Sequence, residues 1–358
     1  MARQRRRYFR NVALFLGGIA TALGIESLTG CAGVGYLLQA GRGQMALIHH
    51  ARPIPVVIAD ERTPPKIREL LSEIPSIKKF GEGRGLKATA NYQEYVKLDR
   101  SHAVYVVSAC ETLRFSEKRW GFPLVGSFPY LGWFDRGNAE NYAQGLRAEG
   151  WDVDVRGAAA FSTLGWFRDA VLSTMISDGQ ESLGDLINVV LHESVHATVY
   201  VNGQADFNES LASFVADRMT LEYFDQVKGA GSEQKQAYVR AESAGKERVE
   251  RFHVTYEKLK AVYASEMSDS EKLAEKSRIL GELKSELQLK REINNATLAQ
   301  FKTYRSGGPE FEGLWSRCEN SWPRFMKAVG RLESQDFASG SSDQALAAAL
   351  SRIEREGC

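Results

Sequence analysis

Residues 186–200 constrain the fold more strongly than any other part of the chain, because they combine a helical apolar pattern with a charged motif. The apolar residues of this segment are Leu186, Ile187, Val189, Val190, Val195, Val199 and Tyr200. Their spacing predicts a largely buried helix. The polar break at 202–206 contains Gly203 and predicts a turn. Asp206 is a suitable N-cap for a second helix, so we expect two helices packed as a tight hairpin.

Two histidines lie inside this buried helix. His192 and His196 stand at i and i+4, so on a helix they share one face and can bind the same zinc ion. Glu209 follows on the second helix and can complete a His₂Glu site, which leaves the fourth position open for water. Glu193 can act as general base on that water. We therefore predict one catalytic zinc ion per chain. The alternative, two core histidines and a solvated glutamate, leaves a costly charge on a buried helix.

Two further polar residues follow Glu209 on nearly the same helical face. Ser213 and Asp217 come about one and two turns later. Either side chain can accept the free ring N–H of a ligand histidine and so fix the orientation of the imidazole. The alternative for both residues is a solvated polar face.

The N-terminal segment has the pattern of a bacterial lipoprotein signal peptide. Five arginines within residues 1–10 precede an apolar stretch over 12–25, which is short and rich in glycine, and Leu28-Thr29-Gly30-Cys31 follows. We expect cleavage after residue 30 and lipidation of Cys31, which would anchor the mature protein to membrane lipid. The alternative is an uncleaved anchor helix with a chance cysteine. Alanine at position 32 favours the outer over the inner membrane, so the expected location is the bacterial cell envelope, facing the periplasm.

Charge and cysteine content narrow the choice of partners and compartment. Removing residues 1–30 takes away five arginines and one glutamate and changes the formal charge from +1 to −3, which gives no case for nucleic-acid binding. Cys318 and Cys358 can pair in an oxidising periplasm, although the connectivity cannot be deduced from the sequence. Cys110 follows an apolar run and is expected to be a buried thiol. The oligomeric state stays open.

The pattern along the chain predicts an α+β fold that is mostly helical, with a small mixed sheet before the histidine helix. After the signal peptide 1–30 we expect a single domain, 31–358, in four parts: an N-terminal α/β part 31–165, the zinc-binding helices 166–230, a helical hairpin 231–305 and a C-terminal helical part 306–358. The expected elements are a helix over 33–50, a helix from Pro64-Pro65, a strand over 103–107, extended structure over 122–134, a helix over 136–149, a strand over 151–155 and an edge segment over 157–163.

The segment 232–304 is charged and free of proline, and we expect a long antiparallel helical hairpin there. Ser268 and Glu271 form a capping-box signature at the start of its second helix. The apolar residues of the first helix step by three and four, and they are Val249, Phe252, Tyr256, Leu259 and Tyr263. The second helix carries Leu273, Leu280, Leu283 and Leu287. Its charges indicate a solvated face rather than a binding site.

Several motifs in the same order resemble the putative aminopeptidase family of bacterial lipoproteins, a gluzincin-like group of zinc metallopeptidases. They are Gly30-Cys31-Ala32-Gly33-Val34-Gly35-Tyr36, Ala51-Arg52-Pro53-Ile54, Phe122-Pro123-Leu124-Val125-Gly126, Tyr130 with Gly132 and Phe134, Ser162-Thr163-Leu164-Gly165-Trp166-Phe167, the zinc motif, Asn294-Asn295-Ala296 and Tyr304. The resemblance implies a zincin-like fold, the ligands His192, His196 and Glu209, and the base Glu193. The chain departs from the family at Leu131, where arginine is favoured, and at Phe161, where tyrosine is favoured.

The resemblance implies a membrane-anchored zinc metallopeptidase that acts on peptides, with aminopeptidase activity as the family's label. Tyr130 and Tyr304 lie in shared motifs and are candidate donors to the developing oxyanion, or packed core tyrosines. Asn294 and Asn295 are candidates for binding the substrate backbone, or for capping helix turns. Two other functions stay open: another cell-envelope zinc hydrolase, such as a peptidoglycan stem-peptide endopeptidase, and a non-catalytic lipoprotein with a structural metal site. A structural site normally has four protein ligands, and no fourth is evident.

Overall fold

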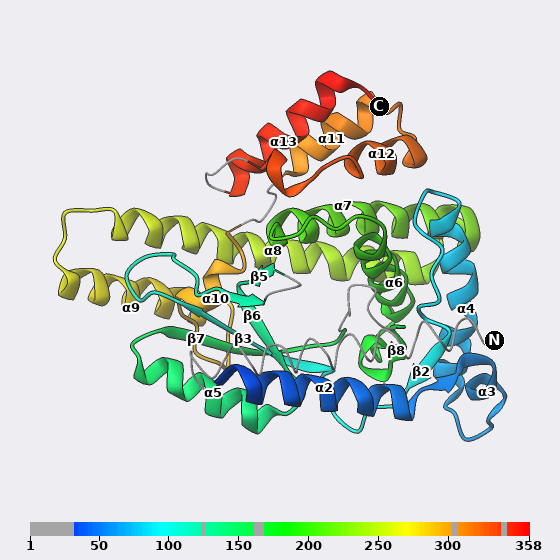
Figure 1. The fold of residues 1–358 in the computed structure, drawn as a ribbon, viewed down its shortest axis with the longest axis horizontal. Helices are drawn as coiled ribbons and strands as arrows, with labels where there is room; N and C mark the ends of the chain where they lie inside the picture. The colour runs from blue at the N-terminus through cyan, green and yellow to red at the C-terminus, as the bar shows by residue number, and fades with distance from the viewer. Residues whose placement is uncertain (1–31, 123–125, 161–167, 303–306, 338–341) are drawn as a thin grey trace.

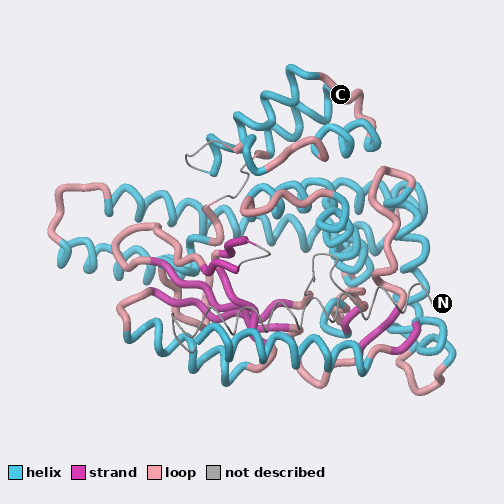
Figure 2. Tube along the Cα trace, in the orientation of Figure 1, coloured by secondary structure: helices cyan, strands magenta, loops and turns pink. Residues whose placement is uncertain are grey.

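The computed structural model describes residues 32–122, 126–160, 168–302, 307–337 and 342–358. The expected signal peptide, Cys31, Phe161 and Tyr304 lie outside the described residues. The described part is an α+β structure in which helices predominate and strands are short (Figure 2), so the predicted class is confirmed. None of the helices in these ranges is both long and apolar enough to cross a membrane.

Twelve helices are labelled α2 to α13 in Figure 1. They are α2 (Ala32–His50), α3 (Ile54–Ala59), α4 (Pro65–Glu82), α5 (Arg136–Ala148), α6 (Ser182–Thr198), α7 (Ala205–Tyr223), α8 (Glu233–Tyr263), α9 (Asp269–Glu286), α10 (Asn295–Ala299), α11 (Gly308–Arg317), α12 (Trp322–Val329) and α13 (Ser342–Glu356). A π-helical segment, Phe224–Gly229, extends α7, and short 3₁₀ turns lie at Ser173–Met175 and Ser334–Asp336. The predicted helices over 33–50, from Pro64-Pro65 and over 136–149 correspond to α2, α4 and α5.

The strands form three small sheets rather than the one mixed sheet that the sequence predicts. The strands are β1 (Arg52–Pro53), β2 (Glu94–Val96), β3 (Val104–Cys110), β4 (Trp120–Phe122), β5 (Gly126–Phe128), β6 (Tyr130–Trp133), β7 (Asp152–Ala158) and β8 (Val171–Leu172). Only the sheet β1-β2-β8 is mixed, with β2 and β8 parallel. The sheet β6-β3-β7 and the pair β4-β5 are antiparallel. The prediction of one sheet was wrong because strands of two or three residues owe their pairing to distant segments and carry no periodicity of their own.

The antiparallel sheet β6-β3-β7 has two different faces. One face packs on α5 through Val107, Ala109, Leu131, Trp133 and Val153, with Ala139, Ala143 and Leu146 on the helix side. The other face carries the alternate residues, and Figure 1 shows α7 and α8 on that side of the sheet and α5 on the other. The edge segment predicted over 157–163 begins with the end of β7, which is an edge strand. Residues 161–163 of that segment lie outside the described ranges.

The largest core lies where α4, α7 and α8 pack against α6, and where α11 and α13 pack on α7. Leu186, Ile187, Val190, Leu191 and Val195 of α6 are fully buried in it, as the apolar pattern predicts. Helices α11 and α12 add aromatic residues to this core, and α13 adds aliphatic ones. A disulfide between Cys318 and Cys358 ties the end of α11 to the end of the chain. Cys110 is a buried free thiol, as predicted.

The predicted helical hairpin consists of α8 and α9, and the Ser268 capping box begins α9 as expected. Its interior contains Phe252, Tyr256, Leu259, Ile279, Leu280 and Leu283. One expectation was wrong. The hairpin ends at Glu286 instead of continuing to residue 304, because the following segment leaves it and forms α10 against β3 and β7. Leu273 lies on the outer face of α9 and is 42% exposed.

Candidate functional site

The α6–α7 hairpin brings the predicted ligand residues together. The chain reverses at Gly203, which adopts a positive φ of 76° that glycine tolerates best. Asn208, in the first turn of α7, binds the backbone of Val201 twice: it accepts from the amide at 2.9 Å and donates to the carbonyl at 2.8 Å. Because Asn208 is buried, this clamp fixes the start of α7 and therefore the position of Glu209 next to it.

The expectation that Asp206 caps this helix was wrong. Gln204 occupies the N-cap position, and Asp206 lies in the first turn. There its charge still interacts favourably with the positive end of the helix. The carboxylate forms an ion pair with Lys302 at 3.4 Å, and Lys302 also pairs with Glu117. This contact between distant segments explains the placement of Asp206 better than its local sequence does.

His192, His196 and Glu209 converge on one point. The two Nε2 atoms are 3.2 Å apart, and the Glu209 oxygens lie 3.4 Å from His192 Nε2 and 3.6 Å from His196 Nε2. Ligand atoms of all three residues lie within 4.8 Å of one another, and this is the one such group found in the described ranges that could hold a metal ion. The side chain of His196 is buried, whereas that of Glu209 is 54% exposed. The group therefore opens toward solvent on its carboxylate side.

The charges of these three residues are strongly coupled. Burial lowers the pKa of His196 to about 4 against the opposing charge of Glu209, so this imidazole is neutral near pH 7. Burial also acts to lower the pKa of His192, but the hydrogen bond with Glu209 and the charge of Glu193 outweigh it and raise that pKa. For Glu209 burial acts to raise the pKa, and its contacts with His192 and His196 lower it overall. An ionised carboxylate beside a neutral imidazole is the state in which such side chains bind metals.

Glu193 lies beside this group on α6 and is half-buried. Its charge contributes to the raised pKa values of two tyrosines, Tyr92 and Tyr130, after the larger effect of their burial. Tyr92 has a φ of 59°, which is unusual for a residue with a side chain, and its amide donates to the Asp169 carbonyl at 2.7 Å. Sequence reasoning missed Tyr92, because nothing in its local pattern distinguishes it from an ordinary loop tyrosine.

Tyr130 is on β6, on the sheet face that is turned away from α5. Burial raises its pKa most, and the charge of Glu209 adds to the effect. The phenol therefore stays protonated at neutral pH and can donate a hydrogen bond. Its hydroxyl makes no hydrogen bond with any residue that the structure describes. Tyr304, the other predicted donor, lies outside the described residues.

The two predicted supporting residues, Ser213 and Asp217, have different surroundings. Ser213 is exposed on α7. Asp217 accepts a hydrogen bond from Asn188 Nδ2 at 3.0 Å and pairs with Lys246 at 3.6 Å, while its charge still acts on His192. His196 Nδ1 is buried and has no hydrogen-bond partner within the described ranges, so neither residue holds that ring in this structure.

Asn294 and Asn295 have structural contacts. Asn294 caps α10 by accepting from the Thr297 amide at 3.1 Å, and it donates to the Val153 carbonyl at 3.0 Å. Asn295 is fully buried, donates to two backbone carbonyls near β3 and accepts from the Tyr263 hydroxyl at 2.7 Å. Asn294 thus matches the helix-capping alternative, whereas the Asn295 amide links α10 to other segments. We do not include either residue in the site.

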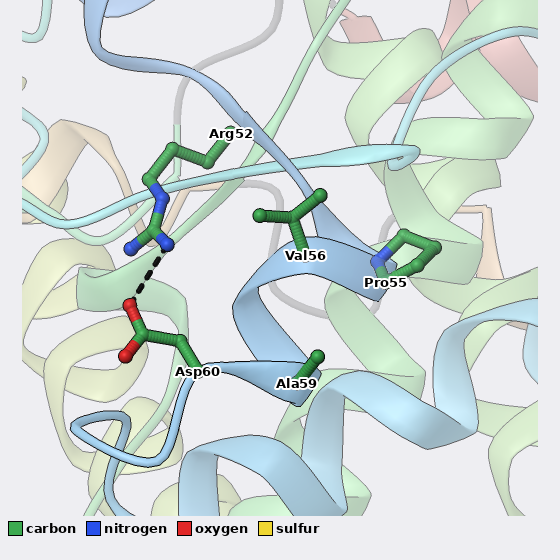
Figure 3. A pocket seen from close by; sticks show the side chains of 5 residues that line it. All are labelled: Arg52, Pro55, Val56, Ala59 and Asp60. Carbon is green, nitrogen blue, oxygen red and sulfur yellow. Dashed lines mark hydrogen bonds and ion pairs between the residues drawn. The ribbon is translucent and has the colours of Figure 1, made fainter.

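Figure 3 shows an open surface depression near α3, and none of the residues of this group lines it. It has a volume of about 510 Å³ and is lined by Arg52, Pro55, Val56, Ala59 and Asp60. Arg52 and Asp60 pair across it at 2.9 Å, and Arg62 also binds Asp60. Its one carboxylate is therefore already neutralised, and we find no catalytic group there.

Comparison with known proteins agrees with the chemistry of the α6–α7 hairpin. No curated protein and no solved structure matches the chain significantly. The family model described as putative aminopeptidase matches residues 35–342, a range that contains the histidines, Glu193, Glu209 and Tyr130. The match supports a peptidase in general. Because it covers most of the sequence, the chain belongs to the putative aminopeptidase family.

Proposed function

We propose that this protein is a membrane-anchored zinc metallopeptidase with a zincin-like site, and that it acts as an aminopeptidase. One observation carries the proposal: two imidazoles and a carboxylate converge beside Glu193, which can serve as a base. The family match adds the expectation of a peptide substrate. The order of these residues on one helical hairpin is that of the zinc motif followed by a downstream carboxylate.

The spacing of the three donors fits zinc. Ligand atoms about 2.0–2.2 Å from a tetrahedral zinc ion are separated from one another by roughly 3.3–3.6 Å. The two Nε2 atoms are 3.2 Å apart, Oε2 of Glu209 lies 3.4 Å from His192 Nε2, and Oε1 of Glu209 lies 3.6 Å from His196 Nε2. A closed structural site would need a fourth protein ligand. Three donors with a partly exposed carboxylate therefore favour a catalytic site over a structural one.

The chain's own residues can then perform the proton transfers of peptide hydrolysis. When bound at this group, zinc supplies a Lewis acid that polarises the scissile carbonyl and makes a water more acidic. Glu193 takes a proton from the attacking water and delivers it to the leaving amine. Tyr130 stays protonated and can donate to the oxyanion that develops at the carbonyl.

The membrane anchor is a separate part of the proposal. Helix α2 begins at Ala32, immediately after Cys31 in the sequence. Lipid on Cys31 would therefore hold α2 at the membrane surface without an intervening linker. The multiple acyl chains of a lipoprotein would make that attachment stable, whereas one chain alone binds only marginally. Peptides of the periplasm would be the available substrates, with the outer membrane as the expected site.

Digestion of a peptide library by zinc-loaded protein tests the function. Peptides with free and with acetylated N-termini should be compared, because an aminopeptidase releases residues only from the free ones. We expect Glu193→Gln to keep zinc and to lose about 10²–10⁴-fold in rate, since the amide cannot act as a base. Glu282→Gln, on the far hairpin, is the matched control. Equal cleavage of acetylated peptides would favour an endopeptidase, and a Glu193→Gln rate within a few-fold of the unmodified protein would contradict the mechanism.

A further inference from the structure

Arg156 shares a sheet face with Tyr130. In the antiparallel sheet, Arg156 of β7 is opposite Val106, and Tyr130 of β6 is opposite Ser108. Residues directly opposite one another point to the same face, and so do residues two apart along one strand. Arg156 and Tyr130 therefore both lie on the face away from α5, which packs on the alternate residues of the sheet.

The guanidinium of Arg156 has no counter-ion of its own among the residues that the structure describes. Its Nε atom is buried and has no hydrogen-bond partner, and no ion pair of Arg156 is found within the described ranges. Asp154 lies two residues earlier on the same face, but its carboxylate is already occupied. It binds Arg291 at 2.6 Å, Gln300 at 3.0 Å and Thr297 at 3.1 Å. The residue as a whole is half-buried, and its Nε lies on the buried side. Because charged groups that are withdrawn from water are normally paired in proteins, this unpartnered Nε indicates that something else supplies the negative charge.

Arg156 also lies within electrostatic reach of the candidate metal group. Burial lowers its pKa, while the charges of Asp154, Tyr130 and Glu209 act in the opposite direction. The effect is mutual, because Arg156 in turn lowers the pKa values of Glu209 and Tyr130. The guanidinium remains protonated at any physiological pH. Three elements, β6, β7 and α7, thus bring one cation, one phenol and one carboxylate together at the same place.

We infer that Arg156 binds an anionic oxygen of the substrate, beside Tyr130 and opposite the His192–His196–Glu209 group. The planar guanidinium suits this role because it can donate two parallel hydrogen bonds to a carboxylate. The oxygen has two possible sources with the same chemistry: the C-terminal carboxylate of a short peptide, or the oxyanion that develops at the scissile carbonyl. Glu209 does not remove the need for this partner, because it is already bound to both histidines. The inference rests on the proposed peptidase function and adds a substrate-binding residue to it.

The test compares two tetrapeptides that differ only in a free or amidated C-terminus, using zinc-loaded full chain. Arg156→Met removes the charge and keeps an apolar chain of similar length. Arg156→Lys keeps the charge but lacks the planar guanidinium that donates two parallel hydrogen bonds. Arg291→Met is the matched control, since it removes a cation from the same neighbourhood that is already paired with Asp154. Zinc content and thermal unfolding of every variant show whether the protein still folds and binds metal.

If the carboxylate is the partner, Arg156→Met should lower kcat/KM for the free acid by about 10–100-fold, the usual effect of losing a charged hydrogen bond, and leave the amide within threefold. If the oxyanion is the partner, kcat should fall by about 10²–10³-fold for both peptides. Arg156→Lys should recover part of either loss, and Arg291→Met should stay near the unmodified protein. Rates of Arg156→Met within threefold on both peptides would overturn the inference.

Peptide binding gives a readout that does not depend on turnover. In a calorimetric titration of metal-free protein, the carboxylate source predicts tighter binding of the free acid than of the amide, and Arg156→Met should abolish the difference. A protein that cleaves neither peptide refutes the proposed function. If this inactive protein also binds the free acid and the amide equally, the inference on Arg156 fails as well. If it binds the free acid more tightly and Arg156→Met removes that preference, the inference on Arg156 is supported although the proposed function is not.

Discussion

Replacing Asn208 by alanine should weaken the fold and the metal site together. Asn208 accepts from the Val201 amide and donates to the Val201 carbonyl, and both residues are buried. The carbonyl keeps a second donor, the Gln204 amide at 3.2 Å, but the amide loses its partner. A buried unsatisfied amide costs about 1–3 kcal/mol, and the other lost hydrogen bond about 0.5–1.5 kcal/mol. The free energy of unfolding should therefore fall by about 1.5–4.5 kcal/mol.

The same substitution loosens the chain directly before Glu209. Residues that orient a metal ligand typically contribute about 10–100-fold to metal affinity, and we expect a loss in that range for zinc. Urea unfolding of metal-free protein measures the stability, and competition with a chelator measures the affinity. Asn202→Ala is the matched control, because Asn202 is exposed in the same turn and should change stability by less than about 0.5 kcal/mol. An Asn208→Ala protein with unchanged stability and zinc affinity would refute the clamp.

Three further predictions concern metal, membrane and disulfide. His196→Ala should lose its zinc in metal analysis, whereas the unmodified protein should hold one ion per chain; equal zinc in both would contradict the ligand assignment. Cys31→Ser should block processing and leave residues 1–30 attached. Mass spectrometry that finds Cys31 without lipid in the protein of native sequence would refute lipidation. Replacing Cys318 and Cys358 by serine opens a loop with a sequence separation of 40 residues. By the chain-entropy relation this should lower the free energy of unfolding by about 4 kcal/mol, and unchanged urea unfolding would count against that estimate.

The sequence predicts well those features that depend on nearby residues. Histidines at i and i+4 in an apolar helical pattern indicate α6 and its buried face, because helical periodicity alone decides which side chains share a face. The Ser268 capping box and Pro64 before α4 mark helix starts for the same local reason. The reversal between α6 and α7 follows from Gly203.

Features that depend on distant segments could not be predicted. Strand β8 has two residues and pairs in parallel with β2, so its existence depends on a partner far away in the sequence. Asp206 looks like a cap, yet its ion pair with Lys302 comes from another part of the fold. Tyr92 and Arg156 carry no motif, and their nearness to Glu193 and Glu209 arises only when loop, sheet and helix meet.

This difference between local and distant features divides the candidate site itself into two parts. The proposed metal ligands and Glu193 lie on one helical hairpin. Its geometry is held by the hydrogen bonds between Asn208 and Val201 and by the core around α6. Tyr130 and Arg156 lie on a sheet that has its own packing against α5. If the proposed function is right, metal binding should depend on the first part alone, whereas turnover should need both parts to face each other. Loss of activity with full zinc content is the signature expected when the sheet side is altered, and loss of zinc is the signature of damage to the hairpin.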